Sequence, residues 1–273
     1  MEQEVLRKLQ LTQLEILKEI DRVCREKEIS YFLVCGTLLG AVRHQGFIPW
    51  DDDLDIGMLR EDYERFKEAA PGLLKEQYEY ITSENTPDYP FMFSKVIKKG
   101  TVFQEAKSKK GGFVQGIYVD VFAYDHFPKE KARQKRQGRK LTVLRALIRD
   151  KTGYATWNSN GKIAFRKLIK NIPFIVLSTF FTKSSLIRRY EKECERYHQV
   201  RTGAYFTLDA EKYGKNVLTE ESIQKTVRLP FEDGAFPCPE GYDAFLKRMY
   251  GDYMELPPEE ERGNRHQILE LKF

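Results

Sequence analysis

Four aspartates within five consecutive positions constrain this chain more than any other feature. Asp51, Asp52, Asp53 and Asp55 lie directly before the apolar run 56–58. Carboxylates this close repel one another, so a folded protein keeps them only around a cation or in contact with water. We expect Asp51 and Asp52 to lie at a solvated loop end or to support the other two.

The segment Asp53–Met58 is predicted to be a strand. Residues two apart on a strand point to the same face, so Asp53 and Asp55 converge while Leu54 and Ile56 face the core. Two convergent carboxylates suit a hard divalent ion such as Mg²⁺, which prefers oxygen ligands. The pair is therefore a candidate metal site.

A third carboxylate interrupts a β-forming run later in the chain. In the predicted strand Gly116–Tyr124, one face carries Ile117, Val119 and Val121, which leaves Asp120 on the other face. A lone carboxylate in a buried strand is costly unless it is paired or ligated. If this strand lies beside the first, three carboxylates meet on one face and can hold two metal ions about 3.5–4 Å apart for displacement at phosphorus. We expect all three to be catalytic and metal-ligating.

A phosphate-binding turn is predicted just before the acids. The apolar run 31–34 is typical of a short strand, and Gly36 and Thr37 lead from it into a helix that ends near His44. Backbone N–H groups at a helix N-terminus bind phosphate oxygens, so Gly36 and Thr37 are candidate substrate-binding residues. Arg43, near the helix end, suits either bidentate phosphate binding or compensation of the helix dipole.

Lys95 is the fourth candidate for substrate contact. It lies in the predicted strand Phe91–Lys98, from which its side chain either reaches a phosphate or lies along the surface. Three histidines, His126, His198 and His266, have no partner evident from the sequence. We expect them to be structural or surface residues.

The periodicity of the whole chain predicts an α/β or α+β fold, in which helices flank a mixed sheet. With 273 residues the chain can bury a core without disulfides, and its four cysteines form no Cys-x-x-Cys pair. A hairpin is expected at Thr226–Cys238, with its turn at Asp233 and Gly234. The other main expected elements are helices at 5–24, 60–70 and 242–250 and strands at 78–82 and 91–98.

A strongly basic segment interrupts this pattern. Between Lys129 and Arg189 there are 17 Lys or Arg but only two acids, Glu130 and Asp150. We predict helices there that either hold the chain against an anionic membrane or form a solvated basic surface. The apolar stretch Leu168–Phe181 is too short and too interrupted to span a bilayer. Aromatic-interleaved basic motifs that would indicate nucleic-acid binding are absent from the sequence.

The first 29 residues carry a charge every few positions and lack the apolar core of a signal peptide. We therefore expect a cytoplasmic protein. If the basic segment binds anionic lipid, the protein would lie at the inner face of the membrane.

Two segments of the sequence carry a recognisable signature. The first comprises Gly36-Thr37-Leu38-Leu39-Gly40, Arg43 and Ile48-Pro49-Trp50-Asp51-Asp52-Asp53-Leu54-Asp55, and the second comprises Phe231-Glu232, Pro239, Tyr250-Gly251-Asp252-Tyr253, Pro257-Pro258 and His266. Both resemble the LicD family, whose relatives include the fukutin-type sugar-phosphate transferases. The likeness covers the ranges 10–125 and 205–268.

The resemblance implies a nucleotidyltransferase-like fold in which Asp53, Asp55 and Asp120 bind Mg²⁺ or Mn²⁺. It also implies transfer of phosphocholine from CDP-choline to a sugar hydroxyl of a cell-surface glycan, such as a teichoic acid or a lipopolysaccharide, with release of CMP. The acceptor would be lipid-linked. The chain would then divide into a catalytic core, a basic helical insertion and a C-terminal part that completes the core, at 1–125, 126–204 and 205–273.

Other functions fit part of the same pattern. The transferred group can be ribitol, glycerol or ethanolamine phosphate from another CDP-linked donor. An Asp-x-Asp glycosyltransferase would use the same carboxylates, but it has no use for Gly36 and Thr37 and usually places the motif after βαβ units. A binding protein that uses the basic segment would release no CMP in the presence of Mg²⁺.

Overall fold

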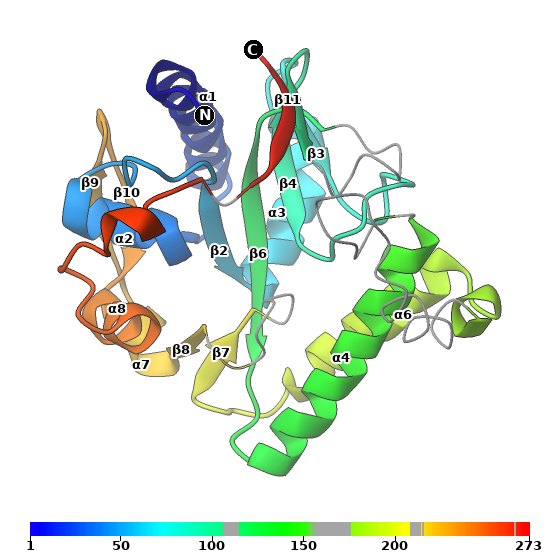
Figure 1. Ribbon diagram of the computed structural model, residues 1–273. Helices are drawn as coiled ribbons and strands as arrows, with labels where there is room; N and C mark the ends of the chain where they lie inside the picture. The colour runs from blue at the N-terminus through cyan, green and yellow to red at the C-terminus, as the bar shows by residue number, and fades with distance from the viewer. Residues whose placement is uncertain (106–114, 153, 155–175, 208–213, 215, 265) are drawn as a thin grey trace.

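A mixed sheet lies at the centre of the fold, with helices on its face and at both sides (Figure 1). The computed structural model describes residues 1–105, 115–152, 154, 176–207, 214, 216–264 and 266–273. The helices are α1 (Gln3–Glu26), α2 (Cys35–His44), α3 (Arg60–Leu73), α4 (Lys131–Lys151), α6 (Lys183–Cys194), α7 (Glu220–Ile223) and α8 (Tyr242–Tyr250), with 3-10 turns η2 (Glu195–Tyr197) and η3 (Glu259–Glu261). The strands are β1 (Phe32–Leu33), β2 (Asp55–Leu59), β3 (Tyr78–Ile81), β4 (Ser94–Lys98), β5 (Val102–Glu105), β6 (Tyr118–His126), β7 (Ala204–Phe206), β8 (Val217–Thr219), β9 (Thr226–Phe231), β10 (Gly234–Pro239) and β11 (Ile268–Lys272).

Strand β6 organises the sheet. The order of strands is β1-β2-β6-β4-β3, with β7 paired to the far end of β6 and β8 paired to β7. The pair β2–β6 is parallel and the other pairs are antiparallel. A mixed sheet flanked by helices confirms the expected fold class.

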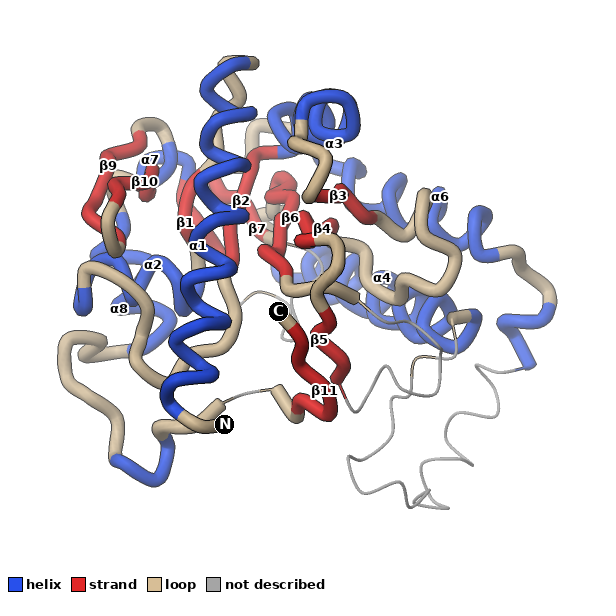
Figure 2. Tube along the Cα trace, turned by 90° about the horizontal axis from the view of Figure 1, so that it is seen from above, coloured by secondary structure: helices blue, strands red, loops and turns tan. Residues whose placement is uncertain are grey.

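Helices α1 and α3 cover one face of this sheet. They contact each other and the strands β2, β4 and β6, and Figure 2 shows α1 running alongside the strands. The apolar stripe of α1 is fully buried at Leu9, Ile16 and Ile20, and it packs in one core with Val119 and Val121 of β6. Burial of each such side chain stabilises the fold by about 1.5–3 kcal/mol. The opposite face of the sheet is therefore the one left for chemistry.

Helices form in the described parts of the basic segment, as predicted. Helices α4 and α6 pack against each other beside the sheet, at lower right in Figure 1. They enclose a second apolar cluster that includes Leu141, Ile148, Ile187 and Tyr190. Of the apolar stretch 168–181, residues 168–175 lie outside the described part of the chain.

Most helix and strand ends differ by up to three residues from the sequence expectation, and two of the differences affect the argument for the site and for the hairpin. Strand β2 begins at Asp55, so Asp53 lies in the preceding loop and the two-residue alternation does not apply to it. In the hairpin, Phe231 pairs with Gly234, which places the turn at Glu232 and Asp233 rather than at Asp233 and Gly234. Glu232 takes a left-handed φ of 57° in this turn.

Glu232 holds that turn against the rest of the core. Its carboxylate accepts hydrogen bonds from Arg7 Nη1 at 2.9 Å and from the Phe47 N–H at 3.1 Å. These contacts join the hairpin to α1 and to the loop after α2. A positive φ is unfavourable for a residue other than glycine. The contacts of the Glu232 side chain with distant parts of the chain offset that cost.

Candidate active site

Two carboxylates face each other across the central strand pair. Asp55, the first residue of β2, lies in register with Asp120 of β6. Backbone bonds fix both positions: the Asp120 N–H donates to the Leu54 carbonyl at 2.9 Å, and the Asp55 N–H donates to Thr37 Oγ1 at 2.8 Å. The sheet therefore brings together two of the three acids that the sequence pattern singles out, and Thr37 of α2 positions one of them.

The loop before β2 adds three more carboxylates. Oxygens of Asp51, Asp52 and Asp53 lie within 4.8 Å of one another, a spacing that can hold a metal ion. Asp51 is 7% exposed and Asp52 is wholly buried, so a solvated loop end is the wrong interpretation of these two residues. The aspartate run is part of the interior of the site.

Glycine at position 36 makes room for this loop. A Cβ added at Gly36 would lie 2.5 Å from Asp51 Oδ2, closer than real Cβ atoms approach an oxygen. The Asp51 carboxylate therefore lies against the first turn of α2, where the positive end of the helix dipole favours negative charge. Any side chain at position 36 would push this carboxylate away.

Crowded negative charge dominates the electrostatics. The pKa of Asp55 is well above its ordinary value because of burial and of the charges on Asp53, Asp120 and Asp51, which outweigh Lys95. The pKa of Asp120 is raised to about 6, chiefly by burial, although Lys95 opposes the shift. Buried carboxylate oxygens that resist ionisation in one another's presence fit a divalent cation, because its charge would offset theirs.

Lys95 lies inside the site. It is 2% exposed, so the surface alternative for this residue is wrong. Its Nζ donates to Asp120 Oδ1 at 2.6 Å and lies 3.1 Å from the centre of the Tyr118 ring. The ammonium group of Lys95 therefore forms an ion pair with Asp120 and also contacts the face of the Tyr118 ring, which attracts cations.

His266 lies beside the aspartate cluster, a position that the sequence reasoning did not predict. Its Nδ1 lies 2.9 Å from Asp52 Oδ1, and its backbone N–H donates to Asp52 Oδ2 at 3.3 Å. Burial opposes a charge on the imidazole, but the bond to Asp52 and the charges of Asp53 and Asp52 raise the pKa of His266 to about 9. A charged imidazole thus fixes Asp52 from a point 214 residues further along the chain.

Arg43 lies at the other end of α2, beside a cleft of about 680 Å³. Its Nη1 donates to the carbonyls of Tyr253 and Glu255, at 2.7 and 3.2 Å. The half-buried Trp50 lines the same cleft. Its ring also meets the edge of His44, with ring centroids 6.2 Å apart. Arg43 therefore shapes a wall of this cleft from the side of α2.

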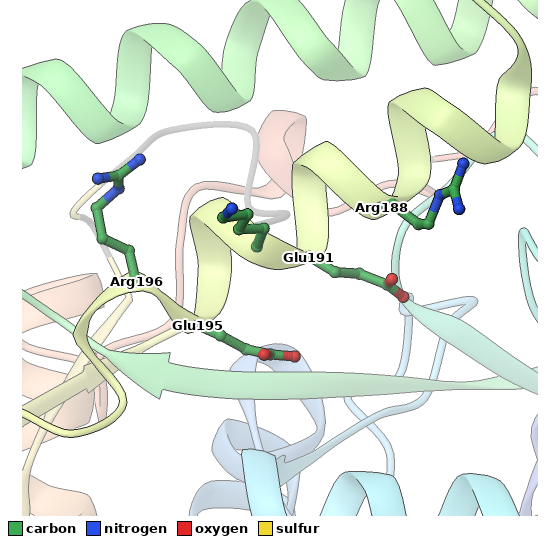
Figure 3. Close-up of a pocket in the computed structure, with 5 residues that line it drawn as sticks. Arg188, Glu191, Glu195 and Arg196 are labelled. Carbon is green, nitrogen blue, oxygen red and sulfur yellow. The ribbon is translucent and has the colours of Figure 1, made fainter.

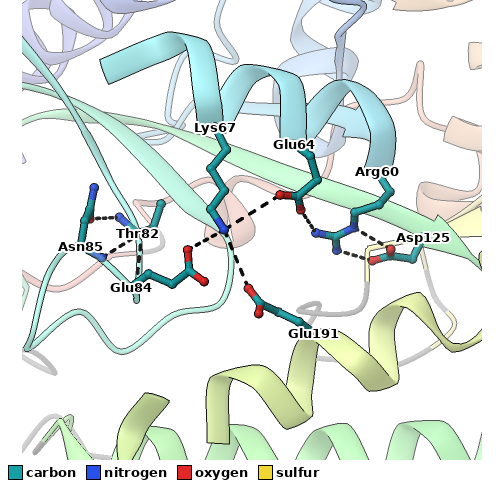
Figure 4. Close-up of polar contacts among 8 residues, drawn as sticks. All are labelled: Arg60, Glu64, Lys67, Thr82, Glu84, Asn85, Asp125 and Glu191. Carbon is teal, nitrogen blue, oxygen red and sulfur yellow. Dashed lines mark hydrogen bonds and ion pairs between the residues drawn. The ribbon is translucent and has the colours of Figure 1, made fainter. Parts of the chain in front are cut away.

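A second buried aspartate lies near the far end of β6, in a different environment. Asp125 accepts two hydrogen bonds from Arg60, at 2.8 and 2.6 Å. Arg60 also bonds Glu64 at 2.9 Å (Figure 4). Burial opposes the charge on Arg60, but Asp125 raises the pKa of the guanidinium well above its ordinary value. This end of the strand is fully paired.

Lys67 extends the paired region towards α6. Its Nζ lies 2.5 Å from Glu84, 3.9 Å from Glu64 and 4.0 Å from Glu191 (Figure 4). Glu191 also lines a cavity of about 550 Å³ along α6, whose other walls carry both signs of charge (Figure 3). Burial, together with Glu84, raises the pKa of Glu191 to about 7. These groups join α3 to α6 and lie apart from the aspartate cluster.

Across the described ranges, every helix is too short or too polar to span a bilayer.

Comparison with known proteins places these residues in a family. A family model for the nucleotidyltransferase domain of LicD, FKTN and FKRP matches residues 28–148. The chain is 32% identical, over 276 residues, to the lipopolysaccharide cholinephosphotransferase LicD of Haemophilus influenzae, and the alignment covers 96% of each protein.

Shorter stretches match other proteins. The chain is 47% identical over 57 residues to an uncharacterised protein of Rickettsia typhi, which is 21% of this chain and 18% of that protein. It is 38% identical over 56 residues to the human ribitol 5-phosphate transferase FKRP, which is 19% of this chain and 11% of that protein. The family domain spans both strands that carry the facing aspartates, and the likeness to the Haemophilus protein spans nearly the whole of both chains. The chain belongs to the LicD family.

Proposed function

We propose that the chain transfers phosphocholine from CDP-choline to a sugar hydroxyl of a cell-surface glycan, such as a lipopolysaccharide or a teichoic acid, and releases CMP. The observation that carries the proposal is the register of Asp55 with Asp120, beside a loop in which Asp51 and Asp52 are buried and Asp53 is half-buried. The likeness over 96% of both chains to a lipopolysaccharide cholinephosphotransferase supports the choice of transferred group and acceptor.

The carboxylates fit a divalent cation. Asp53, Asp55 and Asp120 would hold Mg²⁺ or Mn²⁺, because their oxygens are the ligands that these hard ions prefer and because burial disfavours the charges of Asp55 and Asp120 without a cation. When bound, such ions would offset charge on the donor diphosphate and on the departing CMP. Asp52 is not among the proposed ligands, because both of its carboxylate oxygens already form hydrogen bonds with His266.

In the proposed reaction the hydroxyl oxygen of the acceptor attacks the phosphorus that bears choline. A new oxygen–phosphorus bond forms, the bond from that phosphorus to the bridging oxygen breaks, and CMP leaves with the bonding electron pair. We assign the hydroxyl proton to Asp120 Oδ2, the oxygen that Lys95 does not hold.

The four candidate substrate-binding residues have different parts in this proposal. Gly36 leaves space at the start of α2, and Thr37 orients Asp55 through its backbone N–H. Lys95 keeps Asp120 ionised and lies close enough to meet a phosphate oxygen that approaches Asp120. Arg43 acts from a distance, through the segment at 253–255.

A second candidate is the transfer of ribitol, glycerol or ethanolamine phosphate from the corresponding CDP-linked donor. The 56-residue match to a ribitol 5-phosphate transferase supports it. The same carboxylates would act, because these donors share the diphosphate and the cytidine. An Asp-x-Asp glycosyltransferase is disfavoured by the family to which the chain belongs.

The test is CMP release from a panel of CDP-linked donors, with a glycan acceptor, with Mg²⁺ and after chelation. We expect CDP-choline to be the best donor and the chelator to stop the reaction. A chain with no Mg²⁺-dependent CMP release from any donor would contradict an enzymatic role. A preference for CDP-ribitol would replace the first candidate by the second.

A further inference from the structure

The cleft beside Trp50 has the composition of a nucleoside site. Its walls carry an aromatic ring, several carboxylates and two guanidinium groups, supplied by α2, by the loop before β2 and by the segment after α8. They include Arg43, Trp50, Asp252, Glu261 and Arg262. The volume of about 680 Å³ is in the range of sites that enclose a small organic ligand.

Trp50 presents its ring to a planar cationic group in the cleft. The guanidinium carbon of Arg262 lies 5.5 Å from the centre of the Trp50 ring, and Arg262 Nε donates to the Pro257 carbonyl at 2.8 Å. A nucleobase is also planar, and stacking on an aromatic side chain is a common way in which proteins bind one. Trp50 therefore offers the kind of face on which a base stacks, and a base would take the place of the Arg262 guanidinium there.

The polar groups of the cleft complement a cytidine. Cytosine has an exocyclic amino group that donates to carboxylates, as Asp and Glu do when they read cytosine in DNA. Ribose hydroxyls donate to carboxylates as well. Asp252 and Glu261 supply acceptors of this kind, and Arg262 supplies donors for the acceptor atoms of the base.

The cleft and the aspartate cluster share two segments. Trp50 directly precedes Asp51, and Asn264 Nδ2 donates to the Trp50 carbonyl at 3.5 Å. Two residues beyond Asn264, His266 binds Asp52. The same two stretches of chain thus line the cleft and hold the aspartates. The cleft and the aspartate cluster are therefore neighbours, and one ligand can contact both.

We infer that this cleft binds the cytidine half of the donor, with its base against Trp50. The inference rests on the proposed function for the CDP-linked donor, but it does not depend on which group is transferred. Arg43 is a positioning residue in this site, because it fixes the wall at 253–255 through backbone carbonyls.

Fluorescence can test this directly, because the sequence contains two tryptophans, Trp50 and Trp157. In a Trp157→Phe chain, Trp50 is the sole tryptophan reporter. We expect CMP to quench its emission in a saturable way, with phosphocholine at the same concentrations having no effect. Quenching by phosphocholine instead of CMP would overturn the inference, and so would the absence of any response to CMP.

Calorimetry with CMP as the probe gives a second measurement. Trp50→Leu should weaken CMP binding by about tenfold or more, and Trp50→Phe, which keeps an aromatic face, should recover most of the affinity. Phe180→Leu removes a ring that is 77% exposed and remote in sequence from the cleft, and it should bind CMP like the parent chain. Equal affinity of the Trp50→Leu and parent chains for CMP would contradict the assignment.

The two proposals fail in different ways. CMP binding at Trp50 without CMP release from CDP-choline would contradict the proposed transfer and leave the cytidine site standing. CMP release from CDP-choline with CMP affinity unchanged in Trp50→Leu would overturn the cytidine site and leave the transfer standing.

Discussion

Strand β6 carries two buried aspartates, and their surroundings differ. Asp125 meets a guanidinium with both oxygens and lies in a network of paired charges (Figure 4). Asp120 has one ammonium partner, Lys95, and faces Asp55 and Asp53. The difference teaches that burial alone does not mark a catalytic carboxylate. We expect the catalytic carboxylate to be the one whose neighbours carry more negative than positive charge.

The largest expected effect separates activity from stability at the crowded end. Asp53→Asn and Asp55→Asn should each lower CMP release by about 10³-fold, because the carboxylates offset charge in the transition state. Their thermal transitions should stay at the parent temperature or rise, since one repelling charge is gone. If either variant kept the parent rate of CMP release, the crowded aspartates would not be needed for activity, and the contrast with Asp125 would be wrong.

The opposite pattern is expected at the paired end. Asp125→Asn leaves the buried Arg60 guanidinium with only the more exposed Glu64 as a counter-charge, and this should lower the free energy of unfolding by about 3 kcal/mol. Urea denaturation measures the loss. The folded fraction should keep its CMP release per molecule, which Asp55→Asn cannot do. A fully stable Asp125→Asn chain would show that pairing does not explain this residue.

A smaller effect is expected at His266. His266→Gln removes the charge that fixes Asp52, so CMP release should fall about tenfold and the Mg²⁺ concentration for half activity should rise. His198→Gln is the matched control, because that imidazole is exposed and lies away from the aspartates. Equal losses in both variants would mean that the Asp52 contact has no special part.

The smallest expected effect concerns pH and the paired network. The pKa of Glu191 is raised from an ordinary 4.5 to about 7, so the folded chain binds this proton more tightly than the unfolded chain. The stability this contributes is fully present below pH 4.5 and is lost as the pH rises through 7. The Tm of Glu191→Gln, relative to the parent, should therefore rise between pH 5 and pH 8 by roughly 2–4 °C.

Glu195→Gln is the matched control for that series, because Glu195 follows α6 directly and lines the same cavity (Figure 3). Its Tm should follow the pH profile of the parent. A flat difference between Glu191→Gln and the parent from pH 5 to pH 8 would contradict the raised pKa.

Local sequence patterns predicted the elements that depend on local periodicity. Helix α8 has the bounds expected from its apolar spacing, and α1 extends only two residues beyond the prediction at each end. The pairing of β11 with β5 was not predicted, because it joins residues 268–272 to 102–105 and neither segment has a strong β pattern alone. Pairing over that distance leaves no local signal.

The same distinction applies to the site. Asp55 and Asp120 were predictable, since each is a carboxylate at an unusual place in an apolar strand. The bond between His266 and Asp52 was not, because nothing near His266 in the sequence indicates its partner. The roles of the acids in binding metal, and the contact of the basic segment with an anionic membrane, stay predictions.

The position of β6 between β2 and β4 has a consequence for folding. β2 and β4 are synthesised before β6 and do not pair with each other. The central part of the sheet can therefore form only after β6 has been synthesised and lies between them. Such non-local pairing forms slowly. A nascent chain therefore carries Asp55 with no opposite strand until β6 has been synthesised. The proposed metal affinity should then appear only after β6 has paired with β2, so metal binding would report when this central pair forms.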